Sequence, residues 1–141
     1  METLKKIYMR HYIMDQEQIQ LIQIMEQEVN HLNEQLRLID QNVVELKGLI
    51  ESLNEIEGKD AQEILVNIGK KIYLPVTIQN KELIVDIGKN SLVKKNIPDT
   101  KRLIEEQLGK LSEGKRQVFE RLEDLHKEME RMIAEIEKSA K

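Results

Sequence analysis

The sequence predicts a mainly α-helical protein with a small β region, built as a long antiparallel two-helix coiled coil whose helices are joined by two tandem β-hairpins. Two segments, residues 1–57 and 98–139, carry heptad patterns of apolar residues. Between them, residues 64–97 form the β-rich stretch. This stretch holds a rough internal repeat, since ILVNIGK is followed nineteen positions later by LIVDIGK, which predicts two hairpins of one small sheet. We expect one domain over residues 1–141.

The first helix is expected over about residues 4–57. Its apolar seam alternates steps of three and four residues for more than four heptads, which is typical of a coiled coil rather than of a lone amphipathic helix. Gly58 follows the last periodic turn and suits a helix C-cap. The seam residues are Ile22, Met25, Val29, Leu32, Leu36, Ile39, Val43, Leu46, Ile50 and Leu53.

Towards the N-terminus the seam fails, because the next positions in register are Gln18, Asp15 and His11. Apolar residues are still frequent there, but they do not follow one stripe. Two interpretations stay open: a frayed start with scattered apolar side chains, or an end that exposes adaptable Met, Ile and Tyr surface to a partner. These residues are Leu4, Ile7, Tyr8, Met9, Tyr12, Ile13, Met14, Ile19 and Leu21.

The second helix is expected to start at Asn96 and to run to about Ser139. Asn96 is a suitable N-cap, Pro98 in the first turn loses no needed hydrogen bond, and Asp99 favours the positive end of the helix dipole.

The seam of the second helix is apolar at nine of ten positions, with Lys115 as the exception. Gly109 and Gly114 each cost about 1 kcal/mol relative to alanine inside a helix, so this portion is a local weak point. The seam residues are Ile104, Leu108, Leu111, Lys115, Val118, Leu122, Leu125, Met129, Met132 and Ile136.

Helix length then predicts where the pairing ends. At 1.5 Å per residue the first helix measures roughly 80 Å and the second roughly 60 Å. If both leave the β region together and run antiparallel, the second ends opposite about residue 20 of the first. Residues 1–20 would then overhang, which favours the interpretation as an exposed, partly unpaired tip.

Four short strands are expected in the β-rich stretch, and each pair is joined by a turn in which glycine precedes polar residues. Pro75 lies inside the second run, so that strand should be an edge or bulged strand. A small sheet with open edges is marginal unless other chains complete it, and we therefore expect oligomerisation here. The strands are Ile64–Ile68, Ile72–Ile78, Leu83–Ile87 and Leu92–Ile97.

Composition argues against several classes of function. A net charge of −4 with both signs interspersed is untypical of a nucleic-acid-binding protein. There is no cysteine for disulfide or thiolate chemistry. METLKKIYMRHYIMDQ lacks the apolar core of a signal peptide, and no run approaches the ~20 apolar residues of a membrane span. We expect a soluble, intracellular protein.

Catalytic and metal-binding patterns are also missing. His11, His31 and His126 are far apart and share no metal-ligand spacing. Residues 109–112, GKLS, superficially resemble a phosphate-binding loop, but Ile104 stands where its first glycine should be and the segment lies inside a helix. We therefore expect no enzyme activity, no metal and no cofactor.

The whole arrangement resembles the alpha class of prefoldin subunits. ILVNIGKKIYLPVTI is similar to the first-hairpin pattern of that class, and KELIVDIGKNSLVKKN is similar to the second. Beta-class subunits have one hairpin, so the doubled unit indicates the alpha class. One departure is local: many alpha-class members read Val-Pro-x-Gly at the first turn, where this chain has Val66-Asn67-Ile68-Gly69.

The resemblance implies an ATP-independent chaperone of the cytoplasm that holds unfolded proteins. Prefoldins are hexamers of two alpha-class and four beta-class subunits, and their hairpins join an intersubunit β-barrel. The far ends of their helices grip unfolded polypeptides and pass them to a group II chaperonin, and neither nucleic acid nor a membrane is a partner. The alternative is a structural homo-oligomer or a filament-forming prefoldin-like protein.

The same resemblance assigns two sets of residues in this sequence. The client-binding tips would be Leu4, Ile7, Tyr8, Met9, Tyr12, Ile13, Met14, Met129, Met132, Ile133 and Ile136. The assembly residues of the hairpins would be Leu65, Val66, Ile68, Val76, Ile84, Val85, Ile87 and Val93.

Overall fold

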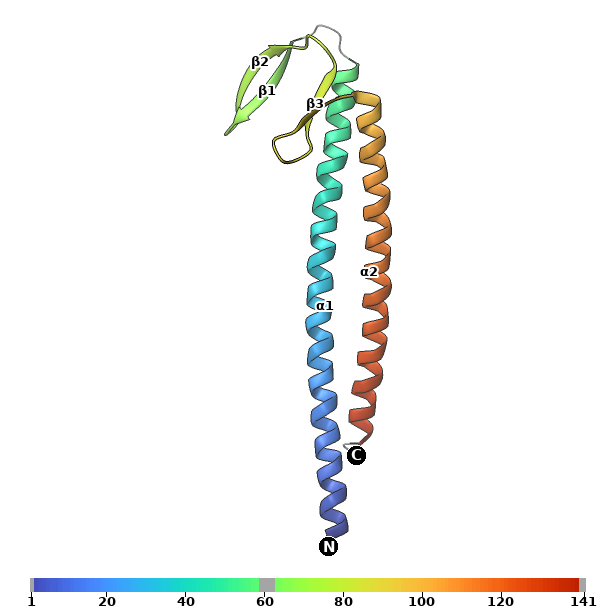
Figure 1. Ribbon diagram of the computed structural model, residues 1–141. Helices are drawn as coiled ribbons and strands as arrows, with labels where there is room; N and C mark the ends of the chain where they lie inside the picture. The colour runs from blue at the N-terminus through green and yellow to red at the C-terminus, as the bar shows by residue number, and fades with distance from the viewer. Residues whose placement is uncertain (1, 59–62, 140–141) are drawn as a thin grey trace. The chain divides into compact units, whose positions relative to one another are not determined.

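The computed structural model describes residues 2–58 and 63–139, without the side chains of residues 2–3, 7–8, 10–14 and 139. Along the chain, one long helix precedes four strands and a second long helix follows them, which confirms the predicted fold class (Figure 1). The elements are α1 (Glu2–Glu57), β1 (Glu63–Gly69), β2 (Ile72–Thr77), β3 (Glu82–Asp86), β4 (Leu92–Asn96) and α2 (Ile97–Ser139).

The chain divides into two compact units, and both helices contribute to each. The helical unit consists of Met1–Asp40 and Ser112–Lys141, and the hairpin unit consists of Gln41–Leu111. The assignment of residues 1–141 to one domain stays a prediction.

In the helical unit, α1 and α2 run antiparallel and side by side (Figure 1). Its core holds Met25 and Leu32 of α1 against Leu122, Leu125 and Met132 of α2. Burial of each such side chain stabilises the fold by about 1.5–3 kcal/mol. Every predicted seam position of both helices is buried or half-buried, Lys115 included, so the coiled-coil seam is confirmed.

The hairpin unit has its own core, formed by Leu53 of α1 and by Ile97 and Ile104 of α2. Leu83 of β3 packs against this cluster, so the second hairpin is attached to the helix ends by an apolar contact. No described residue of β1 or β2 belongs to a buried cluster. The two hairpins are therefore anchored differently, although their sequences are similar.

The start of α2 agrees with the prediction more closely than the end of α1 does. Asn96 caps α2 as expected, because its Oδ1 accepts the N–H of Asp99 at 2.8 Å. Helix α1 ends at Glu57, and the N–H of Gly58 donates to the carbonyl of Asn54 at 3.2 Å. Gly58 has no positive φ, so the helix ends without the left-handed residue of a Schellman cap.

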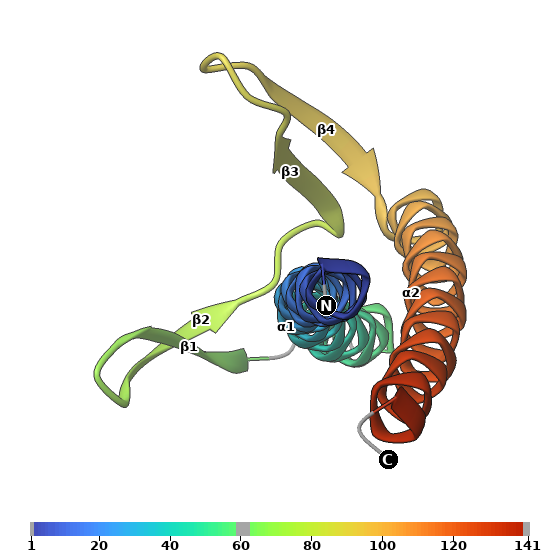
Figure 2. The ribbon, with the colours of Figure 1, turned by 90° about the horizontal axis from the view of Figure 1, so that it is seen from below.

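The strands form two separate two-stranded antiparallel sheets, and the expectation of one small sheet is wrong (Figure 2). Each strand pairs with its neighbour in sequence, Leu65 with Pro75 and Val85 with Val93, and the outer edges pair with nothing described. Pro75 thus lies on an edge strand as predicted, since β2 pairs only with β1.

Two strand boundaries also change. Ile97 was expected at the end of the fourth strand, but it is the first residue of α2 and is buried in the core of the hairpin unit. Ile78 lies outside β2, which ends at Thr77.

Candidate assembly and client-binding surfaces

Both hairpins expose apolar side chains that remain in contact with water in the isolated chain. Leu65 is 66% exposed and Ile84 is 67% exposed, and Val66, Ile68 and Ile87 are exposed as well. Burial of that much aliphatic area stabilises an assembly at about 25 cal/mol per Å². Five of the eight predicted assembly residues therefore lie on a surface suited to contact with another chain.

The other three predicted assembly residues are partly covered by this chain. Val85 and Val93 are half-buried and face each other across β3 and β4. They share their face of the hairpin with Leu83, which packs against the helix ends. Val76 on β2 is also half-buried. The β3–β4 hairpin thus turns one face towards its own helices and leaves Ile84 on the other.

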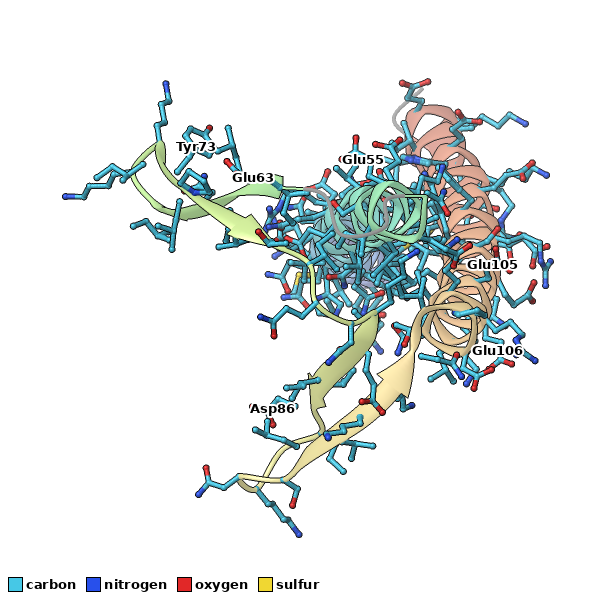
Figure 3. The ribbon with its side chains drawn as sticks, turned by 90° about the horizontal axis from the view of Figure 1, so that it is seen from above. Glu55, Glu63, Tyr73, Asp86, Glu105 and Glu106 are labelled. Atoms are coloured by element: carbon cyan, nitrogen blue, oxygen red, sulfur yellow. The ribbon has the colours of Figure 1, made fainter. Side chains whose placement is uncertain are left out.

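The sequence prediction missed further exposed apolar residues, three on the first hairpin and one on the second. Ile72, Tyr73 and Leu74 of β2 are all exposed, as is Leu92 at the start of β4. Figure 3 shows the side chains that stand on the β1–β2 hairpin, with Tyr73 labelled. The residues of β2 are identified by the exposure of three consecutive side chains, which means that both faces of the strand are uncovered. In a strand with one covered face, exposed and buried side chains would alternate.

Unpaired backbone adds to this surface. Each of the four strands is hydrogen-bonded along one edge only, so each hairpin has two open edges among the described residues. Open edges are templates for strand addition by another chain. The apolar faces and the edges together make the two hairpins the candidate assembly site.

The candidate client-binding tip lies at the end of the helical unit, where α1 extends beyond the end of α2 (Figure 1). Met9 is 62% exposed there, and Leu4 and Ile133 are exposed too. Met129 and Ile136 are half-buried. The side chains of five further predicted tip residues lie outside the described part of the structure: Ile7, Tyr8, Tyr12, Ile13 and Met14.

Met132 does not belong to this exposed surface. It is 5% exposed and packs with Met25 and Leu125 in the core of the helical unit. The expectation that it offers uncovered apolar area is wrong, because its position in the heptad seam directs it into the helix pair. Ile24, which is exposed and lies off the seam, was not predicted. Its place between seam residues Ile22 and Met25 could have identified it.

Charged side chains on the surfaces of the helices form ion pairs. In the helical unit, Arg121 of α2 donates from Nε and Nη2 to Glu28 of α1 at 2.8 Å and 3.1 Å. These hydrogen bonds hold the pKa of Glu28 below its usual range. The pKa of Glu34 is lowered in the same way by Arg37. The two shifted carboxyl groups are thus solvent-accessible partners in ion pairs, and such pairs contribute little to stability.

The described residues offer no site for metal chemistry and no segment suited to a membrane. No group of three or more Asp, Glu or His side chains within them lies close enough together to hold a metal ion. Over the same residues, neither helix contains a stretch apolar and long enough to cross a bilayer.

Comparison with known proteins agrees with the fold. The family model described as "Prefoldin subunit" matches residues 25–141. The prefoldin subunit alpha of Methanobrevibacter smithii is 26% identical over 80% of this chain and 83% of its own length. That of Methanococcus vannielii is 27% identical over 89% and 85%, and that of Methanococcus maripaludis strain S2 is 34% identical over 60% and 58%.

A solved structure has the same fold. It is described as filamentous PFD from Methanocaldococcus jannaschii, and it aligns with a TM-score of 0.71 over 82% of this chain and 98% of its own, at 16% sequence identity. The family match covers most of the chain, and the two hairpins between antiparallel helices agree with it. The chain belongs to the prefoldin family, in its alpha class.

Proposed function

We propose that this chain is a subunit of an ATP-independent chaperone that holds unfolded polypeptides at the ends of its helices. The observation that carries the proposal is the exposed apolar surface of Leu4 and Met9, where α1 has no partner helix, together with the exposed Ile133 near the end of α2. Flexible aliphatic and thioether side chains adapt to many apolar sequences. Several such tips in one assembly would bind one client through many weak contacts.

The assembly itself belongs to the same proposal. Two alpha-class chains would combine with four beta-class chains, and their hairpins would join an intersubunit β-barrel. Support comes from the open edges and from the exposed faces of Leu65, Ile68 and Ile84, which gain stability only when another chain covers them. Prefoldins are a chaperone family rather than an enzyme family, which agrees with the absence of a catalytic pattern in the sequence. The chaperone would work in the cytoplasm and deliver its clients to a group II chaperonin.

The client site is tested by suppression of aggregation, with a cognate beta-class subunit present. Deletion of residues 1–20 should abolish most of the holding activity of the assembled complex. A double substitution of Leu4→Ser and Met9→Ser should lower it without changing the mass of the complex. Val44→Ser is the matched control, because Val44 is 71% exposed but lies outside the tip. Full activity after the deletion would refute the tip assignment.

The assembly site is tested separately by native mass. Leu65→Asp combined with Ile84→Asp should prevent formation of the mixed complex, because both charges would be buried in the barrel. Val44→Asp should leave the complex intact. If the double variant still assembles, these strand faces are not the interface.

A second candidate is self-assembly of this chain into homo-oligomers or filaments. It is favoured by the four open strand edges, because strand addition at two separate hairpins need not close into a ring. Native mass of the chain alone distinguishes the two. A concentration-dependent ladder supports self-assembly, whereas a small species that becomes a hexamer with beta-class subunits supports the chaperone.

A further inference from the structure

The turns of both hairpins hold lysines in a backbone conformation that lysine seldom adopts. Lys70 and Lys71 have φ of 48° and 63°, and Lys89 has φ of 54°. Two-residue hairpin turns with positive φ at both central positions favour Asn, Asp and Gly, because Cβ crowds the backbone there and only Asn and Asp offset this with local hydrogen bonds. Only Asn90 follows that preference among the four central residues.

The shape of these turns does not depend on the lysine side chains. Gly69 and Gly88 precede the central residues with φ of 130° and 96°. The N–H of Gly69 donates to Oδ1 of Asn67 at 2.8 Å, and the N–H of Gly88 donates to Oδ1 of Asp86 at the same distance. Both turns thus have a glycine with positive φ whose N–H donates to the side chain two residues earlier. Neither feature involves a lysine side chain.

The lysine side chains themselves are exposed, and within the described residues they have no ion pair or hydrogen bond. Other lysines of the chain do find partners, such as Lys101 with Glu57 at 3.3 Å and Lys115 with Asp40 at 2.6 Å. A strained residue that contributes no internal contact indicates that its side chain is kept for another purpose. We call Lys70, Lys71 and Lys89 the basic tips.

Charge is distributed unevenly along the chain in a way that suggests the partner. Residues 63–96 contain six lysines and three carboxylates, which gives a net charge of +3. The whole chain has a net charge of −4, so the remaining residues, which are mostly helix, carry −7. A basic hairpin region and acidic helices on one chain are complementary between two copies of it.

We propose that the basic tips bind the acidic helices of a second copy of this chain. The contact joins different surfaces on the two copies, so it is heterologous. In each pair, one copy keeps its basic tips free and the other keeps its helices free. The contact uses charge, whereas the proposed barrel uses apolar strand faces and backbone edges.

The test compares self-association of the full chain at low and at high salt by analytical ultracentrifugation. The tip variant combines Lys70→Asn, Lys71→Gly and Lys89→Asn. We expect about tenfold weaker association at low salt, with little remaining salt dependence. Because the new residues suit positive φ, the melting temperature should be unchanged or higher. Loss of association without loss of stability is an outcome that a purely structural role of the lysines does not produce.

A matched control removes three charges from the helices, with Lys6→Gln, Lys47→Gln and Lys110→Gln. It should associate as well as the unmodified chain, or more tightly, because it makes the helices more acidic. A second control, with arginine at all three tip positions, should retain association.

Four results would overturn the proposal. The first is an unmodified chain without salt-dependent self-association, and the second is a tip variant that associates normally. The third is a tip variant that loses stability and association together. The fourth is binding of single-stranded DNA or anionic vesicles through the basic tips while self-association does not require them.

Discussion

Arg121 of α2 and Glu28 of α1 are 93 residues apart in sequence and form a bidentate pair across the helical unit. Two parallel N–H···O bonds fix both distance and orientation, which a single contact does not. The pair therefore reports on whether the two helices are in the correct register.

The first prediction concerns acid. Since the folded pKa of Glu28 lies below its usual value of 4.5, the pair adds stability above that value. This stability is lost as the pH falls through the lowered folded pKa. Glu28→Gln should thus lower the melting temperature at about pH 7 and have no effect near pH 2. The effect should be small because both side chains are solvated and screened.

Circular dichroism melts across this pH range measure the difference. Glu26→Gln serves as the control, because Glu26 has no ion pair among the described residues. An equal effect of both substitutions at every pH would contradict the role of the pair.

The second prediction concerns the polar position of the seam. Lys115 is half-buried between the helices, and its Nζ lies 2.6 Å from Asp40 Oδ1. Lys115→Leu should raise the free energy of unfolding by about 1 kcal/mol, because leucine fills an apolar seam and the exposed Asp40 loses little. Lys115→Glu should lower it, since two carboxylates would then meet. Urea denaturation measures both, and a destabilised leucine variant would show that the ion pair matters more than packing.

The third prediction compares two apolar residues on the same helix. Leu125 is 2% exposed, so Leu125→Ala should cost about 2–5 kcal/mol by leaving a cavity. Phe119 is 53% exposed, with Lys115 Nζ 5.8 Å from its ring centroid. Phe119→Ala should cost less than about 1 kcal/mol despite the larger side chain. Similar losses in urea would mean that Phe119 is covered in solution.

The fourth prediction tests the junction between strand and helix. Asn96→Ala removes the acceptor of the Asp99 N–H and should cost about 1 kcal/mol. Asn96→Ser should restore most of that stability, because its hydroxyl accepts the same hydrogen bond and places no second carboxylate beside Asp99. Thermal melts of the three proteins give the comparison, and an alanine variant of unchanged stability would exclude a capping role.

The heptad seam and the helix start were predictable because both depend on local spacing. Ile22 to Leu53 repeat at steps that only a paired helix uses, and Asn96 precedes proline and aspartate as N-caps do. The same spacing also predicts the environment of Met132. Its seam position predicts burial, and that outweighs its nearness to the end of the helix.

Sheet organisation was harder to predict, because alternation along a strand assigns side chains to faces but does not say which strands pair. The similarity of Ile64–Lys70 to Leu83–Lys89 was interpreted as one sheet. In the structure Leu83 packs against the helix ends, whereas the matching Ile64 belongs to no buried cluster. The anchoring of one copy depends on residues distant in sequence, such as Leu53, so the repeat alone could not reveal it.

Ile97 starts α2 at the residue immediately after β4, and no linker separates the two elements. Asn96 ends the strand and caps the helix, so one residue serves both. A rotation of β4 about its own axis would therefore change the azimuth of the first turn of α2. Any chain that pairs with β4 would, in this geometry, also set the direction in which that turn points.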